Sequence, residues 1–471
     1  MPGARLQTAC GFTRGPNPPS RRNPRAGASR FASKFAANLL ERGTPMQIKP
    51  FAAVRPAARV AADVAALPYD VYDRAEAARA VEGKPLSFLN IDRPETAFPP
   101  DQDMYAPEVY AHARAAFDAR RADGTFVAED EPCLYLYELT MDGRAQTGVV
   151  ACCSIDEYLD GTIKKHENTL EAKERDRIEH MLALDAQTGP IFLTYRDSNA
   201  VNALVEAVKE TPALYDFVAD DGVAHRVWRM AASSEAPAAR EAAGALVAAF
   251  ADVSAAYIAD GHHRTASAVK VGLRKREAAG SYTGEEEFNY FLSVLFPASE
   301  LACLPYNRVV HDLNGLSKEE FLQSMAGEAG PFEIVAEQAA AYEPAVKGDV
   351  GMYLDGTWYG LRLKAAFASD DAVEGLDASI LQNHVLQPIL GIDDPRTSSR
   401  ISFVGGIRGT AELERKVNAA DAAGTGPAVA FAMFPTAIEE LLRVADESKL
   451  MPPKSTWFEP KLRSGLFAHL L

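Results

Sequence analysis

Short apolar runs alternate with amphipathic stretches along most of the chain, which predicts an α/β protein of the mixed α+β kind. The run VSAAYIAD at 253–260 predicts a buried strand, and TASAVKVGLRKREAAG at 265–280 predicts the helix that follows it. Polar and apolar positions recur at helical spacing over 163–181. The pairs Asp142-Gly143 and Asp355-Gly356 predict the tight turns of two β-hairpins.

Three segments follow from this pattern. Residues 1–45 carry eight basic side chains and one acidic one, with prolines that break any helix. We expect this segment to be a disordered basic leader or a misassigned start before Met46. We expect an N-terminal α/β domain over 46–330 and a C-terminal α+β domain over 331–471.

Composition narrows the class of function. The chain has 471 residues, 47% of them hydrophobic, with 49 Lys and Arg against 65 Asp and Glu and a net charge of -16. This excess of negative charge argues against nucleic acid and anionic membranes as partners. Five cysteines without a CxxC pair, and no apolar run of membrane-spanning length, indicate a cytoplasmic protein that binds small molecules. The sequence predicts no oligomeric state.

The first candidate site is Asp260-Gly261-His262-His263-Arg264, at the expected strand-to-helix turn. A helix N-terminus binds phosphate or carboxylate through its free N–H groups, and glycine lets the main chain approach the anion. Arg264 would add a two-pronged contact, and the histidines would donate hydrogen bonds or move protons. The alternative is that Asp260 only caps the helix while the histidines cover a surface turn.

The second candidate site is the segment IKKHENTLEAKERDRIEHM at 163–181. At helical spacing, one polar and mostly cationic face is shared by His166, Thr169, Lys173, Arg177 and His180. A helix that enters through Lys164-Lys165-His166-Glu167 would place positive charge against its own dipole, which favours a bound anion there. The alternative is a solvated helix whose glutamates neutralise it. Weaker candidates are the carboxylates Asp70 and Asp73 and the pair Asp92 and Arg93.

The motifs RPAARVAADVAALPYDV, IKKHENTLEAKERDR, GPIFLTY, IADGHHRTASA, NRVVHDL, RISFVGG and MPPKSTWFEPKLRSGL resemble, in this order, the family called domain of unknown function 1015. The Asp-Gly-His-His-Arg turn also resembles the Gly-x-x-Arg box of the ParB/sulfiredoxin-like fold, including its free serine kinases. The resemblance implies a ParB/sulfiredoxin-like nucleotide-binding core elaborated by a C-terminal α+β region.

By that resemblance, the leading hypothesis is a small-molecule kinase that uses ATP or another phosphoryl donor, with magnesium, on a hydroxylated metabolite such as L-serine. The alternatives are a nucleotide-binding regulatory module without catalysis and, less favoured, metal-dependent hydrolysis through Asp260 and the two histidines. The catalytic candidates are Asp260, His263, Glu167 and His166, and Asp260 is also the candidate magnesium ligand. The candidates for holding the cofactor are Gly261, His262, Arg264, Lys165, Lys173 and Arg177.

Overall fold

The computed structural model describes residues 46–424 and 426–471, and the prediction for residues 1–45 lies outside them. Within the described part, a nine-stranded mixed sheet has the order β6-β11-β8-β12-β5-β4-β10-β9, with β1 paired to β5. Its β6–β11 and β8–β12 pairs are parallel and the others antiparallel. The strands are β1 Ile48–Lys49, β4 Leu134–Met141, β5 Arg144–Ser154, β6 Ile163–Lys164, β8 Ile191–Tyr195, β9 Tyr215–Val218, β10 Ala224–Met230, β11 Ala256–Asp260 and β12 Tyr290–Pro297.

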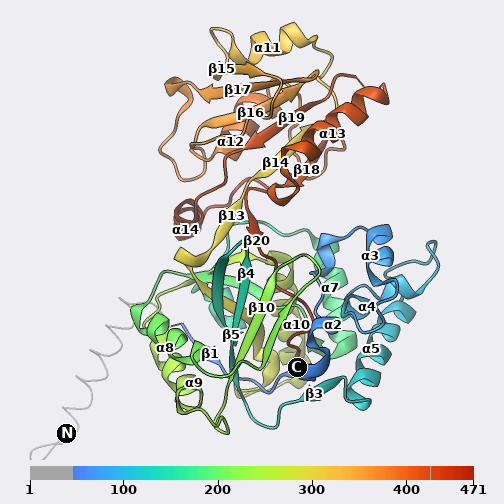
Figure 1. The fold of residues 1–471 in the computed structure, drawn as a ribbon, viewed down its shortest axis with the longest axis vertical. Helices are drawn as coiled ribbons and strands as arrows, with labels where there is room; N and C mark the ends of the chain where they lie inside the picture. The colour runs from blue at the N-terminus through green and yellow to red at the C-terminus, as the bar shows by residue number, and fades with distance from the viewer. Residues whose placement is uncertain (1–45, 425) are drawn as a thin grey trace, which may run out of the picture. The chain divides into compact units, whose positions relative to one another are not determined.

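A second, six-stranded sheet is antiparallel throughout, with the order β15-β17-β16-β19-β14-β18 (Figure 1). Its strands are β14 Tyr306–Val310, β15 Phe332–Gln338, β16 Asp349–Leu354, β17 Thr357–Leu363, β18 Ile401–Gly405 and β19 Val429–Met433. Three further strand pairs are β2 Val54–Pro56 with β3 Phe126–Ala128, β7 Ala186–Gln187 with β21 His469–Leu470, and β13 Ala302–Leu304 with β20 Trp457–Glu459. The mixed α/β architecture predicted from the sequence is confirmed.

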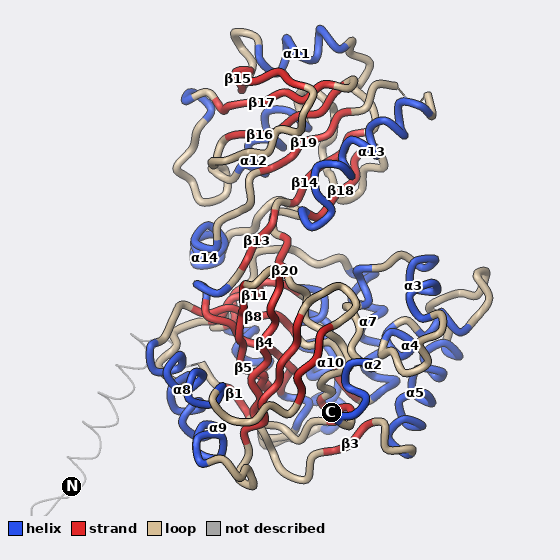
Figure 2. The backbone as a smooth tube through the Cα atoms, viewed as in Figure 1, coloured by secondary structure: helices blue, strands red, loops and turns tan. Residues whose placement is uncertain are grey.

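The helices of the described residues are mostly short, and α10 is the longest at 18 residues (Figure 2). None of them is both long and apolar enough to cross a membrane. Their bounds are α2 Ala61–Val64, α3 Arg74–Val81, α4 Leu89–Asp92, α5 Pro107–Ala122, α6 Ile155–Asp160, α7 Glu171–Leu184, α8 Asn199–Lys209, α9 Pro237–Phe250, α10 His262–Ala279, α11 Lys318–Ala326, α12 Asp377–Leu381, α13 Gly409–Ala422 and α14 Ile438–Asp446, with a π-helical turn at Gln382–Leu386.

The nine-stranded sheet buries both of its faces, which explains the continuous apolar runs in its strands. On β4, Leu134 and Leu136 point to the face covered by α7, α8, α9 and α10, while Tyr135 and Tyr137 point to the opposite face. That opposite face is covered by α14 and by the last residues of the chain, including Leu466 and Phe467. The C-terminal segment is therefore part of the core beside the first sheet.

The strands of the two sheets are also not separated cleanly along the sequence. The second sheet takes β14 from before residue 330, and β20 and β21 come after it but pair with β13 and β7. The strands of the second sheet therefore begin before residue 330, and the domain boundary expected at that residue stays a prediction. Strand pairing across more than 150 residues leaves no local signal in a sequence.

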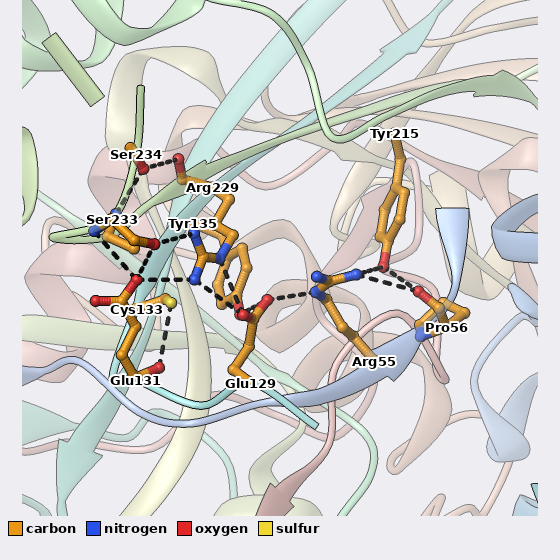
Figure 3. A network of polar contacts seen from close by, with 11 residues as sticks. Arg55, Pro56, Glu129, Glu131, Cys133, Tyr135, Tyr215, Arg229, Ser233 and Ser234 are labelled. Atoms are coloured by element: carbon orange, nitrogen blue, oxygen red, sulfur yellow. Dashed lines mark hydrogen bonds and ion pairs between the residues drawn. The ribbon is translucent and has the colours of Figure 1, made fainter. Parts of the chain in front are cut away.

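A buried ionic network connects the strand pair β2–β3 to the nine-stranded sheet (Figure 3). The Glu129 carboxylate, only 5% exposed, accepts hydrogen bonds from Arg55 Nε at 2.5 Å and from Arg229 Nε at 3.0 Å. Arg229 also pairs with Glu131 at 3.0 Å, and Tyr215 donates its hydroxyl to the Pro56 carbonyl at 2.6 Å. These contacts tie the β2–β3 ribbon to β9 and β10.

Candidate functional site

The strand-to-helix turn at residues 260–264 forms as predicted. Strand β11 ends at Asp260, Gly261 has a φ of +97°, and α10 begins at His262. Only glycine adopts this left-handed conformation without strain, so the turn requires Gly261. No side chain caps the helix. The first-turn N–H groups, which a helix cannot satisfy internally, are thus left for a ligand or water.

The segment after β6 differs from its prediction. Lys164 belongs to β6, which pairs in parallel with β11, and α7 begins only at Glu171. The predicted helical entry through Lys164 and Lys165 is wrong, because pairing with Tyr257 fixes Lys164 in an extended strand. The real first turn carries Glu171 and Glu174, which suit the positive end of the helix dipole. The argument for an anion at that entry therefore fails.

The two predicted clusters nevertheless meet at one cavity of about 300 Å³. It lies at the N-terminus of α10, and the loop before α7, the first turns of α7 and two stretches near residues 70 and 100 complete its wall. Its lining residues are Tyr69, Asp70, Tyr72, Arg93, Pro94, Glu95, Met104, Tyr105, Tyr110, Glu167, Lys173, Asp176, Arg177, Asp260, Gly261, His262, His263 and Lys454. The weaker candidates Asp70 and Arg93 belong to this wall as well.

Outside this wall lie several residues singled out from the sequence, among them Lys165, His166, His180, Arg264, Asp73 and Asp92. The Lys165 ammonium lies 5.8 Å from the centre of the Tyr158 ring, on α6. His166 is 2% exposed, and its ring packs edge-on against that of His262, with 4.4 Å between the ring centres. Arg264 donates from Nη1 to the Pro190 carbonyl at 2.5 Å and pairs with Asp260 at 3.3 Å. Arg264 therefore stabilises the turn through Pro190 and Asp260 and does not line the cavity.

Both histidines of the turn are held by main-chain groups. His262 Nε2 accepts the N–H of His166 at 3.5 Å, and His263 Nε2 accepts the N–H of Leu170 at 3.0 Å. Each ring therefore carries its proton on Nδ1 when neutral. Burial lowers the pKa of His263 to about 4, helped by Lys173 and Lys454, and burial with neighbouring His166 lowers the pKa of His262 well below 6.5. Both are neutral at pH 7.

The carboxylates of the cavity fall into two electrostatic states. Burial would raise the pKa of Asp260, but Lys461 and Arg264 beside it hold that pKa below its usual range. Its side chain is 31% exposed and pairs with Lys461 at 3.4 Å. Burial raises the pKa of Glu167, against the opposing effect of Lys454. Glu167 Oε2 lies 3.9 Å from His262 Nδ1. Asp260 is thus a fixed anion, while Glu167 is the more basic carboxylate.

The cations of the wall also differ in how they are engaged. Arg177 pairs with Asp176 at 2.6 Å, and its guanidinium lies 4.0 Å from the centre of the Tyr69 ring. Lys173 and Lys454, in contrast, have no ion-pair partner among the described residues. Both residues are exposed, and the Lys454 ammonium lies 5.5 Å from the centre of the Tyr306 ring. Both can therefore offer positive charge to a ligand in the cavity.

Lys454 is one of several wall residues that were not predicted from the sequence; the others are Tyr69, Tyr72, Pro94, Glu95, Met104, Tyr105, Tyr110 and Asp176. Lys454 lies in the motif MPPKSTWFEPKLRSGL, at a φ of +59°, and its carbonyl accepts a hydrogen bond from Arg308 Nη2 at 3.2 Å. Arg308 is buried and lies on β14 of the second sheet. A lysine after two prolines is a weak signal alone, because the 191 positions between it and His263 conceal their proximity.

The described residues contain no group of three or more His, Cys, Asp or Glu arranged to hold a metal ion. This finding disfavours hydrolysis at a metal held by Asp260, His262 and His263. Magnesium requires less of the protein, because it is commonly bound by one or two carboxylates together with substrate phosphates and water. Asp260 and Asp70 are the carboxylates on the wall near the helix turn that fit this use.

Comparison with known proteins gives a family and distant structural neighbours. Residues 48–379 match the model of the family described as "Protein of unknown function (DUF1015)". No curated protein matches the chain. Among solved structures, a C-terminally truncated SbnI from Staphylococcus aureus is 12% identical, with a TM-score of 0.34, over 68% of this chain and 87% of that one. A free serine kinase in complex with AMP is 12% identical, with a TM-score of 0.29, over 68% and 91%. A conserved hypothetical protein from Pyrococcus furiosus is 13% identical, with a TM-score of 0.31, over 69% and 95%.

Proposed function

We propose that this chain, which belongs to the DUF1015 family, transfers a phosphoryl group from a nucleotide or a similar donor to the hydroxyl group of a small metabolite. One observation carries the proposal. The uncapped N-terminus of α10 opens into a cavity whose wall also holds two lysines without ion-pair partners in the described chain and one carboxylate with a raised pKa. A ParB/sulfiredoxin-like core and L-serine as the acceptor are finer parts of the same proposal.

The anion-binding half of the cavity suits the donor phosphates. The N–H groups of Gly261, His262 and His263 point from a helix N-terminus, where main-chain donors and the dipole both favour negative charge. Lys173 and Lys454 would neutralise the phosphate oxygens during transfer. Phosphoryl transfer asks the protein mainly for such positioning and charge stabilisation. Asp260 or Asp70 would hold magnesium, which would supply positive charge to offset that of the donor phosphates.

The other half suits the acceptor. Glu167 would take the proton from the substrate hydroxyl as that oxygen bonds to the terminal phosphorus of the donor. The bond between this phosphorus and its bridging oxygen breaks, and the shortened donor leaves with the electron pair. The raised pKa of Glu167 makes it a stronger base than an ordinary carboxylate. His262 Nδ1 is a neighbour of Glu167 Oε2 at 3.9 Å, which is too long for a hydrogen bond.

The direct test is product formation. Purified protein is incubated with magnesium, with ATP, ADP or polyphosphate, and with L-serine or a mixture of hydroxylated metabolites, and phosphorylated products are identified by mass spectrometry. Glu167→Gln should lower kcat by about 100-fold or more while it keeps donor binding. Glu171→Gln, an exposed glutamate on the same segment but outside the cavity wall, is the matched control and should keep full turnover.

A second pair of variants tests the donor half. Lys173→Ala should weaken donor binding, while Lys165→Ala should not, because Lys165 lies against Tyr158. Absence of transfer with every donor and acceptor would contradict the kinase proposal. Saturable nucleotide binding without consumption would instead favour the regulatory module.

A further inference from the structure

We propose that Tyr105 determines the choice of phosphoryl donor, by stacking its ring on the base of a nucleotide at the mouth of the cavity. The proposal rests on the proposed function, because it assumes that the donor phosphates lie at the N-terminus of α10. It adds that the donor is a nucleoside phosphate and not an inorganic polyphosphate. It also names the side chain that makes this distinction.

The size of the cavity is the first step. About 300 Å³ is at the lower end of the range for small-molecule sites. The triphosphate of a donor and a small hydroxylated acceptor together take up such a space. The nucleoside part of the donor must therefore lie toward the rim, where its base needs a flat apolar partner to bind.

The nature of the wall is the second step. Its deep part is almost entirely charged or hydrogen-bonding, and two of its tyrosines are already engaged. The guanidinium carbon of Arg177 lies over the Tyr69 ring, 4.0 Å from its centre, and the Tyr110 hydroxyl donates to Asp176 Oδ1 at 2.9 Å. Tyr105, in contrast, is 56% exposed, and its neighbour Met104 lines the same wall. An aromatic ring and a methionine on the same wall offer an apolar surface suited to a base.

The third step concerns the hydrogen bonds that hold the loop carrying Tyr105. Tyr105 lies between Phe98 and the start of α5, and Arg74 of α3 donates to the carbonyls of Gln102 at 2.7 Å and Pro99 at 3.0 Å. The Tyr105 N–H donates to Asp103 Oδ1 at 2.9 Å. These contacts hold the main chain on which Tyr105 stands. Ligand binding therefore requires no ordering of the main chain at Tyr105, and only the side chain has to be fixed.

A comparison of two ligands tests the inference. Dissociation constants are measured by calorimetry for magnesium ATP and for magnesium tripolyphosphate, which has the phosphates but no base. Tyr105→Ala should weaken ATP binding by about 5- to 150-fold, the range that removal of one base-stacking aromatic side chain produces. The same variant should bind tripolyphosphate as the wild type does, which also shows that it is folded. Tyr105→Phe should keep ATP binding. Tyr282→Ala removes a tyrosine that is 49% exposed outside the cavity wall and is the control.

Each contrary outcome has a distinct meaning. If the wild type binds tripolyphosphate as tightly as ATP, or if Tyr105→Ala weakens both ligands equally or neither, the stacking role is refuted while the phosphate site stands. If Tyr72→Ala, which alters another ring of the same wall, abolishes the preference for ATP and Tyr105→Ala does not, the wrong ring has been assigned. If the wild type binds neither ligand, the proposed function fails and the inference with it.

Discussion

Replacement of His166 by phenylalanine should remove part of the sensitivity of this protein to acid. His166 is 2% exposed, and neither of its ring nitrogens has a hydrogen-bond partner among the described residues. Its ring packs edge-on against His262, an arrangement that phenylalanine reproduces without a titrating group. We selected His166 from the sequence as a catalytic candidate, and the variant separates that role from a structural one.

The magnitude follows from the pKa of His166, which burial lowers from 6.5 to about 4. Because the folded pKa is depressed, the unfolded chain binds more protons between pH 6.5 and pH 4, and stability is lost as the pH falls through this window. One pKa unit corresponds to about 1.4 kcal/mol. The window between pH 6.5 and pH 5 spans about 1.5 units, so His166 should contribute about 2 kcal/mol to the loss of stability between pH 7 and pH 5.

The assay is urea denaturation of the wild type and of His166→Phe at pH 7 and pH 5, followed by circular dichroism. The variant should lose about 2 kcal/mol less than the wild type between the two pH values. A constant change in stability from repacking cancels in this difference. Between pH 5 and pH 7 the buried His166 is neutral, so its removal takes no charge away from His262. Equal losses in both proteins would refute the reasoning, and unchanged phosphoryl transfer in the variant would end the catalytic role.

Two further substitutions test the framework of the site. Glu129→Ala should destabilise the protein by about 3–5 kcal/mol, since it leaves two arginines without their shared buried carboxylate. Glu131 is more exposed, so Glu131→Ala should cost about 1 kcal/mol or less. Denaturation midpoints with unchanged slopes measure both changes in stability, and equal effects of the two variants would contradict the reasoning. Gly261→Ala should weaken both stability and tripolyphosphate binding, because its methyl group would lie 3.0 Å from Arg264 Nε in addition to the backbone strain at φ +97°. Gly161→Ala has a similar φ of +88° with open space around it, so it should reproduce the strain of about 1–3 kcal/mol but not the loss of binding.

The local features of the fold could be predicted from the sequence. The strand before Gly261 and the helix after it follow from an apolar run, a glycine and a helical pattern, and the structure places all three within a few residues of the expectation. The hairpin turn at Asp142-Gly143 is confirmed by the positive φ angles of both residues, 52° and 77°. Each of these features depends on residues that are close together in the chain. Sequence patterns report such local interactions, so these features could be predicted.

The errors arose where distant segments decide the structure. The prediction of a helix before residue 171 was wrong because β11, more than 90 residues away along the chain, pairs with Lys164 and holds it extended. The direction of Arg264 depends on the Pro190 carbonyl, which periodicity does not reveal. His166 likewise has its contacts with remote segments, since its ring packs on that of His262 and its carbonyl accepts the N–H of Met451 at 2.8 Å. A polar residue in a charged stretch gives no sign that the fold will enclose it.

Lys454 shows why the C-terminal part of the chain cannot be separated from the site. It is the one cavity residue within the described ranges that follows α10. Its segment is hydrogen-bonded to the loop after β6 through Met451 and to the second sheet through Arg308. A displacement of β14 relative to β11 would move Lys454 while Glu167, His262 and His263 stay together. Removal of the C-terminal segment would also strip Leu466 and Phe467 from the first sheet. Point substitution of Lys454 or Arg308, and not truncation, therefore measures what the second sheet contributes to phosphate binding.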